Sequence, residues 1–360
     1  MKRIPGLGMA ARIFFVAILP ALSSPAMGQS FKLFLVGDAG EDTKTGETLR
    51  NLGLQLVANP NSAVIFLGDN CYKSGLGDIL PYGFKGFDSS TNTIQKMHSQ
   101  LDILQNYRGY VFFVPGNHDW WNITNVQKGR PKLKMEQSFV EANLGKNQTI
   151  SNPGHVFFPQ NGDPGPATVV LPGDSVRLIF IDTYRLIIES YKSKDKEEGP
   201  VERGFYHRLD SMVLDARGRH QRLIVAAHHT LYAKGPNSKP LANPYLFARI
   251  KASNSNFPSY NTMREKIRAV LVQYPGCYYA CGHIHSLQYF FPPDSVHYIV
   301  SGAGSKTVYV SAKNMEKNKP GPGKESLVWN SKGFFEIDFC RPQDQIWMYS
   351  DNGKKKSAIP

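Results

Sequence analysis

Five short polar motifs along this chain bring together carboxylates, imidazoles, an amide and a phenol, the side chains that bind and bridge metal ions. In chain order they are Gly37-Asp38-Ala39-Gly40, Gly68-Asp69-Asn70-Cys71-Tyr72, Gly116-Asn117-His118-Asp119, His228-His229 and Gly282-His283-Ile284-His285. Two cations about 3.5 to 4 Å apart can clamp a phosphate group, lower the pKa of a bound water and stabilise the oxygens that attack and leave. The motifs therefore predict a dinuclear site for phosphoryl chemistry.

Two ions held this close require a negatively charged bridge. Asp69 is the natural bridge, because a carboxylate can give one oxygen to each ion. The other candidates divide into Asp38 and His285 for one ion, and Asn117, His228 and His283 for the other. His283 and His285 lie two residues apart and would share one face of an extended strand. We therefore expect the turn after that strand to let the two imidazoles diverge.

Tyr72 distinguishes this motif set from an ordinary site for two divalent ions. A phenolate is a hard anionic donor suited to a trivalent ion, and tyrosinate binds iron in some haem proteins. Many two-metal phosphoesterases carry a histidine two residues after the first aspartate, and that position here is Gly40. The added phenol and the missing imidazole are complementary, and together they favour a ferric ion.

The elements that must position these residues are short buried strands. Each motif follows an apolar run, and the runs are residues 31–36, 63–67, 110–114, 223–227 and 277–280. Such runs are typical of strands buried on both faces. Ligands placed just after them converge at the carboxyl ends of an open sheet. One site is therefore expected to form from motifs spread along the chain.

Helix-like stretches alternate with the strands, and this order predicts an α/β fold. The expected helices are residues 45–58, 93–105, 206–217 and 262–273. Further strands are expected at 177–182, 296–300 and 334–339, the last two forming a second sheet. Two loop-rich insertions, 117–154 and 235–260, are expected to shape the substrate pocket.

The first residues have the plan of a secretory signal peptide. Lys2, Arg3 and Arg12 precede or begin an apolar stretch over residues 13–22, and small residues end at Gly28. That stretch is about half of the roughly 20 residues that a membrane span needs. We expect residues 1–28 to be removed on export to the periplasm or the medium, with no membrane association afterwards. Residues 29–350 would then form one domain, followed by a mobile tail over 351–360.

The formal net charge of +13 falls to about +10 without the three basic residues of that signal. A basic surface favours anionic partners, and small phosphate esters fit this charge. The lysines and arginines are scattered, and no nucleic-acid fold motif is present, so no specific nucleic-acid partner is expected. Four cysteines allow up to two disulfides in an oxidising compartment. The sequence leaves their pairing, the oligomeric state, the divalent metal and the physiological substrate open.

The ordered motifs GDAG, GDNCY, GNHD, VAAH and GHIH resemble those of the purple acid phosphatases, and especially the small tartrate-resistant type, in the calcineurin-like metallophosphoesterase superfamily. The likeness runs from about Phe31 to Asp338 and includes fragments such as residues 301–304, SGAG. It implies a four-layer sandwich in which two mixed sheets are flanked by helices. It also implies Fe(III) paired with Fe(II), Zn(II) or Mn(II). Carried over by motif, Asp38, Asp69, Tyr72 and His285 would bind the ferric ion, and Asp69, Asn117, His228 and His283 the divalent one.

Four other residues carry expectations of their own. His118 is expected beside the metals, with Asp119 orienting its imidazole, and His229 is expected to point away from them. In the small purple acid phosphatases a second histidine follows the fourth motif, and the matching position here is Lys234. A lysine can bind phosphate as a point charge, but with a usual pKa of about 10.4 it is a poor general acid.

These residues predict an exported acid phosphatase that hydrolyses phosphate monoesters by in-line attack of a metal-bound hydroxide. His118 would protonate the leaving oxygen or stabilise the transition state. A phosphodiesterase or nucleotide hydrolase on the same scaffold is the alternative enzyme. It would need room for a second ester group near Trp120-Trp121 or within residues 235–260. A non-catalytic binding protein is the alternative from another class, but it would have no need of a bridging carboxylate.

Overall fold

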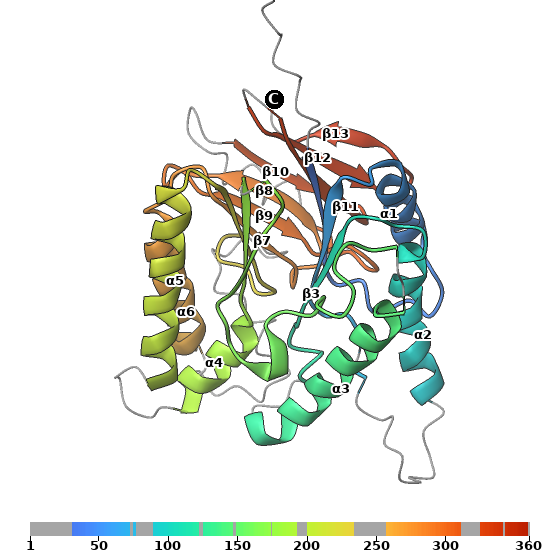
Figure 1. Ribbon diagram of the computed structural model, residues 1–360, viewed down its shortest axis with the longest axis horizontal. Helices are drawn as coiled ribbons and strands as arrows, with labels where there is room; N and C mark the ends of the chain where they lie inside the picture. Colours follow the sequence, from blue (N-terminus) through green and yellow to red (C-terminus); the bar gives the residue numbers. More distant parts are fainter. Residues whose placement is uncertain are drawn as a thin grey trace, which may run out of the picture. The chain divides into compact units, whose positions relative to one another are not determined.

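Two β-sheets organise the computed structural model of this chain (Figure 1). The structure describes residues 31–72, 75–76, 89–121, 125–146, 149–173, 175–192, 200–233, 257–310, 325–340 and 343–358. These residues belong to one compact unit that begins at Phe31. The expected signal segment, residues 1–28, lies outside the described residues.

The first sheet has six strands in the order β13-β12-β11-β1-β2-β3. Their bounds are β1 Phe31–Val36, β2 Ser62–Leu67, β3 Tyr110–Val114, β11 Gly333–Phe339, β12 Gln345–Ser350 and β13 Lys355–Ser357. Strands β1, β2 and β3 are parallel neighbours, whereas β11 pairs antiparallel with β1. The first three motifs therefore follow the carboxyl ends of adjacent parallel strands.

The second sheet has seven strands in the order β10-β8-β9-β7-β6-β5-β4. Their bounds are β4 Ala167–Val170, β5 Val176–Phe180, β6 Arg222–Ala226, β7 Tyr278–Cys281, β8 Leu287–Phe291, β9 His297–Ser301 and β10 Glu325–Trp329. Strands β5, β6, β7 and β9 are parallel, whereas β4, β8 and β10 pair antiparallel with their neighbours. The fourth and fifth motifs follow β6 and β7, again at the carboxyl ends.

Helices cover the outer face of each sheet. The helices are α1 Glu47–Ala58, α2 Ser89–Leu101, α3 Val126–Leu144, α4 Thr183–Lys192, α5 Pro200–Gly218 and α6 Phe257–Leu271, with short 3₁₀ turns at Asp102–Leu104 and Gln160–Gly162. In Figure 1, α1 and α2 flank the sheet that contains β11, and α5 and α6 flank the sheet that contains β7. Each uses an amphipathic face, as the spacing of the buried Leu49, Leu52 and Leu56 in α1 illustrates.

Three apolar layers hold this arrangement together. Along β1, Leu33 and Leu35 pack between the two sheets, whereas Phe34 and Val36 pack under the helices of the first sheet. A third cluster, which includes Val225 of β6, lies between the second sheet and its helices. Side chains of a strand alternate between its faces, so strands that are apolar throughout can be covered on both sides. This is the predicted four-layer α/β sandwich, which the structure confirms.

Three local expectations differ from the structure. The region expected to be a loop-rich insertion contains α3, a 19-residue helix. The sequence did not predict this helix because its polar outer face and its single proline conceal a buried stripe that includes Leu133, Val140 and Leu144. Strands β9 and β11, expected in one late sheet, belong to different sheets. Within the expected mobile tail, Lys355–Ser357 forms β13 and pairs with β12.

The cysteines and helices of the described region bear on two further expectations. All four cysteines, Cys71, Cys277, Cys281 and Cys340, are free thiols, and the first three are buried. The allowed disulfides are therefore not formed here. Among the residues that the structure describes, none of the helices is long and apolar enough to cross a membrane.

Trp120 and Asp182 form a buried polar link in this fold. The indole N–H of Trp120 donates to a carboxylate oxygen of Asp182 at 2.7 Å, and the amide of Arg185 donates to the other oxygen at 2.9 Å. Both Trp120 and Asp182 have no exposed surface. Burial raises the pKa of Asp182 from 3.8 to about 7, although its hydrogen-bond donors act in the opposite direction.

We expect Asp182→Asn to change how stability depends on pH. With the pKa of Asp182 raised to about 7 in the folded protein, the contribution of this group is fully present below its unfolded pKa and is lost as pH rises through 7. The wild type should therefore lose roughly 2 to 3 kcal/mol relative to the variant between about pH 5 and pH 8. Denaturant unfolding at both pH values measures this difference.

The control is Asp215→Asn, because hydrogen bonding to Arg219 lowers the pKa of that exposed carboxylate. It should show no loss of this sign. A stability difference between wild type and Asp182→Asn that is the same at both pH values would contradict the account.

Candidate metal centre

Backbone hydrogen bonds join the loop after β1 to the loop after β2, and the loop after β6 to the loop after β7. The amide of Asp38 donates to Gly68 at 2.9 Å, that of Tyr72 donates to Gly40 at 2.9 Å, and that of Gly282 donates to His228 at 3.1 Å. These bonds connect motifs that are far apart in sequence. The amide of His283 donates to a carboxylate oxygen of Asp38 at 2.7 Å and connects the two pairs of loops at the carboxyl edges of the two sheets.

Three candidate ligands occupy the left-handed region of backbone space, which side chains other than glycine seldom adopt. Their φ angles are 57° for Asp38, 53° for Asp69 and 68° for His283. Such conformations cost energy and persist where the surroundings determine them, often at functional sites. The turn at His283 also separates it from His285, as the sequence led us to expect.

The first group of donor atoms consists of Tyr72, Asp38 and His285. The Tyr72 hydroxyl donates to Oδ1 of Asp38 at 2.6 Å and lies 3.1 Å from Nε2 of His285. Nε2 of His285 lies 3.3 Å from the same Asp38 oxygen. The other Asp38 oxygen accepts the amide of His283 at 2.7 Å, which fixes the carboxylate plane.

The second group consists of Asn117, His228 and His283. Oδ1 of Asn117 lies 3.1 Å from Nε2 of His228 and 3.1 Å from Nδ1 of His283, and those two nitrogens are 3.1 Å apart. Nδ1 of His228 donates to the Leu67 carbonyl at 2.8 Å. That bond fixes the ring orientation and turns Nε2 toward the group, as is usual for a metal-binding histidine.

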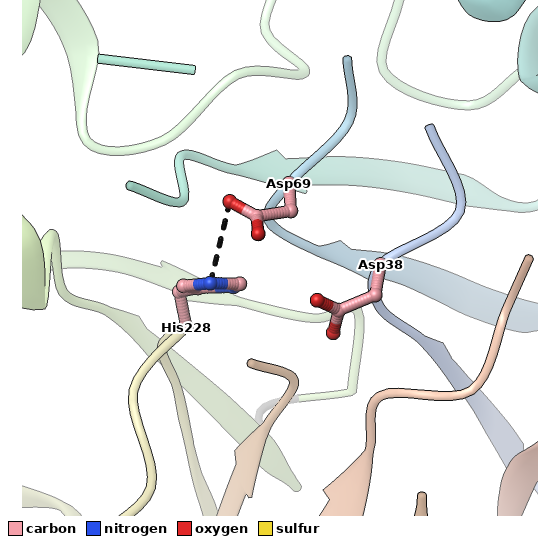
Figure 2. Close-up of side chains that lie close together, drawn as sticks. All are labelled: Asp38, Asp69 and His228. Atoms are coloured by element: carbon pink, nitrogen blue, oxygen red, sulfur yellow. Dashed lines mark ion pairs between the residues drawn. The ribbon is translucent and has the colours of Figure 1, made fainter. Parts of the chain in front are cut away.

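Asp69 lies between the two groups. Its Oδ1 is 3.4 Å from Nε2 of His228 and accepts the amide of His118 at 2.9 Å. One ligand atom from each of Asp38, Asp69 and His228 can be chosen so that all three lie within 4.8 Å of one another. Figure 2 shows these three side chains converging from the ends of different strands on a shared space. This is the position that a bridging carboxylate requires.

The donor set fits two metal ions. Neighbouring ligands about 2.0 to 2.2 Å from an ion lie roughly 2.8 to 3.6 Å from one another in octahedral or tetrahedral coordination. The distances of 3.1 Å within the second group fall in this range. The first group spans 2.6 to 3.3 Å. Carboxylate, amide and phenol oxygens and imidazole nitrogens are all suitable metal ligands.

The electrostatics of the buried groups agree with a cation site. Burial would raise the pKa of Asp69, but His228 and His118 hold it well below its usual value. Burial would lower the pKa of His228, yet Asp69 raises it to about 9. For Tyr72, burial and then the charges of Asp38 and Asp69 raise the pKa well above 10. A phenolate at this position therefore needs positive charge beside it.

Gly40 and Tyr72 are coupled through the backbone. A side chain at Gly40 would overlap the backbone of Asn70 and Cys71, and the Gly40 carbonyl accepts the Tyr72 amide. The loop after β1 thus approaches the Tyr72 loop only because this position lacks a side chain. This close approach explains physically why the missing histidine and the added tyrosine occur together.

His118 and Asp119 have different surroundings. The His118 ring lies 4.5 Å from the Tyr72 ring between centroids, and its Nε2 lies 3.9 Å from Asp69. Asp119 is fully buried and accepts the amides of Gly116 at 2.7 Å and Cys71 at 3.1 Å. Asp119 therefore holds the second and third motif loops together. Its expected part in orienting His118 remains a prediction.

His229 and Lys234 complete the expected residues. Nδ1 of His229 is 2.8 Å from the hydroxyl of Thr183, and its carbonyl accepts Tyr279 at 2.7 Å. It is buried against its own partners, and burial holds its pKa well below 6.5. Lys234 and most of the 235–260 insertion lie outside the described residues. Trp120 is fully buried, so it cannot line a pocket, whereas Trp121 is partly exposed.

The sequence reasoning missed a buried carboxyl group behind the site. Glu136 on α3 has no exposed surface, and its Oε1 is 3.4 Å from the side-chain Nδ2 of Asn70. Burial raises the pKa of Glu136 to about 8. Asn70 also donates to the Val114 carbonyl at 3.0 Å. Glu136 thus supports the loop that carries Asp69, and no sequence signal identified it because α3 was not recognised as a helix.

The fold and the two donor groups define a metal-dependent phosphoesterase. The family model for calcineurin-like phosphoesterases matches residues 31–287, more than half of the chain. The chain belongs to this family, whose members use a centre of two metal ions to hydrolyse phosphate esters. The comparison with curated proteins found no match.

Solved structures that resemble the chain include the following three. GAP50, the anchor in the inner membrane complex of Plasmodium, is 14% identical with a TM-score of 0.52 over 91% of this chain and 88% of that one. A dimetal phosphatase from Danio rerio is 13% identical, with a TM-score of 0.48 over 91% and 98% of the two chains. A putative 5'-nucleotidase from Staphylococcus aureus, in complex with alpha-ketoglutarate, is 13% identical, with a TM-score of 0.41 over 91% and 53%. The likeness to GAP50 concerns the fold alone.

The close approach at Gly40 leads to a prediction. Gly40→Ala forces the first two motif loops apart, because the added carbon would overlap the backbone of Asn70. Overpacking of this kind costs about 1 to 3 kcal/mol, and the loss of loop geometry should lower the metal content per chain. Denaturant unfolding and elemental analysis measure the two effects.

Gly218→Ala is the matched control, since a carbon added there meets nothing within 4 Å. That variant should keep its stability and its metal. A Gly40→Ala protein with wild-type stability and metal content would refute the coupling between Gly40 and the Tyr72 loop.

Proposed function

We propose that this protein is a purple acid phosphatase-like enzyme that hydrolyses phosphate monoesters with an Fe(III) ion and a divalent ion. The observation that carries the proposal is the phenol oxygen of Tyr72, which lies 2.6 Å from Asp38 and 3.1 Å from His285. A site for two divalent ions has no need of a phenolate, whereas a ferric ion binds this hard donor well. The ferric ligands are Asp38, Asp69, Tyr72 and His285, and those of the divalent ion, Fe(II), Zn(II) or Mn(II), are Asp69, Asn117, His228 and His283.

The bound ions would supply Lewis acidity and lower the pKa of a water molecule. The chain supplies the rest. Asp69 holds the two groups of ligands at a fixed separation, and the bond between Nδ1 of His228 and Leu67 keeps Nε2 directed at the site. His118 lies at the exposed side of the centre, with 14% of its side chain accessible. Its Nε2 would give a proton to the leaving oxygen of a monoester.

The two alternatives make different demands on the same centre. The Plasmodium anchor shows that a protein can have this fold and be named for another role, so the fold does not decide catalysis. The complete set of donor atoms supports an enzyme. A comparison of a phosphate monoester with its diester separates the phosphatase from a phosphodiesterase. The monoester should be hydrolysed with the higher kcat/KM.

Two expectations about surroundings belong to this proposal. The pattern of residues 1–28 supports export, so the enzyme would act outside the cytoplasm.

Lys234 would bind the substrate phosphate as a point charge. Replacing Lys234 should therefore raise KM with little change in kcat.

The iron assignment predicts a coloured protein. Wild type should be violet, with a broad tyrosinate-to-iron absorption band, and Tyr72→Phe should lose the band and most of the iron. Absorption spectra combined with elemental analysis test this. Tyr107→Phe is the matched control, because Tyr107 is equally buried but bonds to Ser62 at 2.8 Å. A colourless wild type that is fully active with zinc or manganese alone would refute the ferric site.

The proton-donor assignment predicts a dependence on the leaving group. General-acid catalysis contributes about 10²- to 10⁴-fold where the leaving group needs a proton. His118→Ala should therefore reduce kcat far more for an alkyl phosphate than for an aryl phosphate. His155→Ala, at an exposed loop position, serves as the control. Equal losses on both substrates would remove His118 from the acid role.

A further inference from the structure

Lys306 places a positive charge against the face of the Tyr72 ring. Its ammonium nitrogen lies 3.2 Å from the ring centroid, well within the roughly 6 Å range of cation–π contacts. Tyr72 is 2% exposed, and the Lys306 side chain is 31% exposed. The contact is therefore partly withdrawn from water. Cation–π contacts are stronger when they are removed from water.

The backbone around Lys306 is fixed to the metal loops. Gly304 donates its amide to Gly37 at 3.0 Å, and Ser305 donates its amide to Asp38 at 3.1 Å. The Ser305 hydroxyl donates to the same Asp38 carbonyl at 2.5 Å. The residue that precedes Lys306 is thus bound directly to a candidate ferric ligand. This attachment sets where the lysine side chain begins.

Glu41 holds the other end of the lysine. The ammonium of Lys306 donates to a carboxylate oxygen of Glu41 at 3.1 Å, and the Glu41 amide contacts the hydroxyl of Ser305 at 3.4 Å. An ion pair with 31% and 36% exposed side chains contributes little stability by itself. Its geometric effect is larger, because it holds the ammonium over the ring instead of letting it extend into solvent.

We propose that Lys306 is a positioning residue that stabilises the Tyr72 phenolate, and through it the ferric ion. The inference rests on the proposed function, because it requires a phenolate. Phenolate charge spreads into the ring, where a cation on the ring face attracts it more strongly than it attracts a neutral phenol. Oδ1 of Asp38 lies 2.6 Å from the Tyr72 hydroxyl, so a phenolate stands beside a carboxylate of the same charge. Lys306 supplies opposing charge from the chain itself.

A cation at this position could instead bind the substrate phosphate. The contacts favour the first role, since the ammonium is already engaged by the ring and by Glu41. The two roles differ in what they change. A stabiliser of the phenolate alters the absorption band and the retention of iron without substrate, whereas a phosphate contact alters KM alone.

The test compares the absorption spectra and iron retention of full-length wild type, Lys306→Met and Lys306→Arg. Methionine keeps the length of the side chain and removes the charge. Because a nearby cation lowers the energy of the phenolate electrons, its loss should move the tyrosinate-to-iron band to longer wavelength. Iron retention against a chelator should weaken roughly 2- to 30-fold, the range that corresponds to a cation–π contact. Arginine should restore most of both properties.

Two further variants serve as controls. Lys96 donates to the carbonyl of Tyr72 at 2.9 Å, so Lys96→Met removes a cation from the backbone side of the same residue. It should shift the band much less. Glu41→Gln leaves the Lys306 charge in place and should give a smaller shift than Lys306→Met.

The outcomes distinguish this inference from the function on which it rests. A violet wild type whose band and iron retention are unchanged in Lys306→Met would overturn the role of Lys306 and leave the ferric phosphatase standing. A raised KM as the only effect would overturn it in favour of substrate binding. A colourless wild type would overturn both the ferric site and this inference.

Discussion

The structure depends on keeping two carboxylates, Asp38 and Asp69, buried side by side at the ends of adjacent parallel strands. Both side chains are almost inaccessible to water, and an uncompensated buried charge is costly. The chain compensates them with amide N–H groups, from His283 to Asp38 and from His118 to Asp69. Imidazoles complete their surroundings. The remaining oxygen and imidazole nitrogen atoms form two groups with Asp69 between them, as the binding of two cations requires.

The sandwich provides the rigidity that this arrangement needs. Three of the candidate ligands, Asp38, Asp69 and His283, have left-handed backbones, and such strain persists only where neighbouring structure determines it. Here the neighbouring structure consists of strands packed on both faces, with Phe34 and Val36 toward the helices and other side chains between the sheets. Behind the loops, Asp119 and Glu136 bind backbone and amide groups of the second motif. A precise site therefore rests on an ordinary apolar core.

Tyr72 links the backbone geometry to the chemistry. Its place next to Asp38 requires the close approach at Gly40, and its phenolate requires positive charge nearby. Lys306 would supply this positive charge from the chain, and a bound metal ion would supply it from solution. The proposed acid phosphatase function and the proposed role of Lys306 thus rest on the same electrostatic argument.

The sequence alone determined the motif residues, the buried strands before them and the α/β class, because strand-end ligands and doubly buried strands leave local patterns. The four-layer arrangement came from the resemblance of the ordered motifs to a known family. The sequence also anticipated that His283 and His285 would diverge. It could not show that residues 126–144 form a helix, or that β9 and β11 join different sheets, because strand partners and buried helix faces depend on distant neighbours. Only the tertiary structure revealed Glu136 behind Asn70 and Lys306 over Tyr72, contacts between residues 66 and 234 positions apart in the chain. No local pattern records such pairs, since each is created when separate loops and helices pack together.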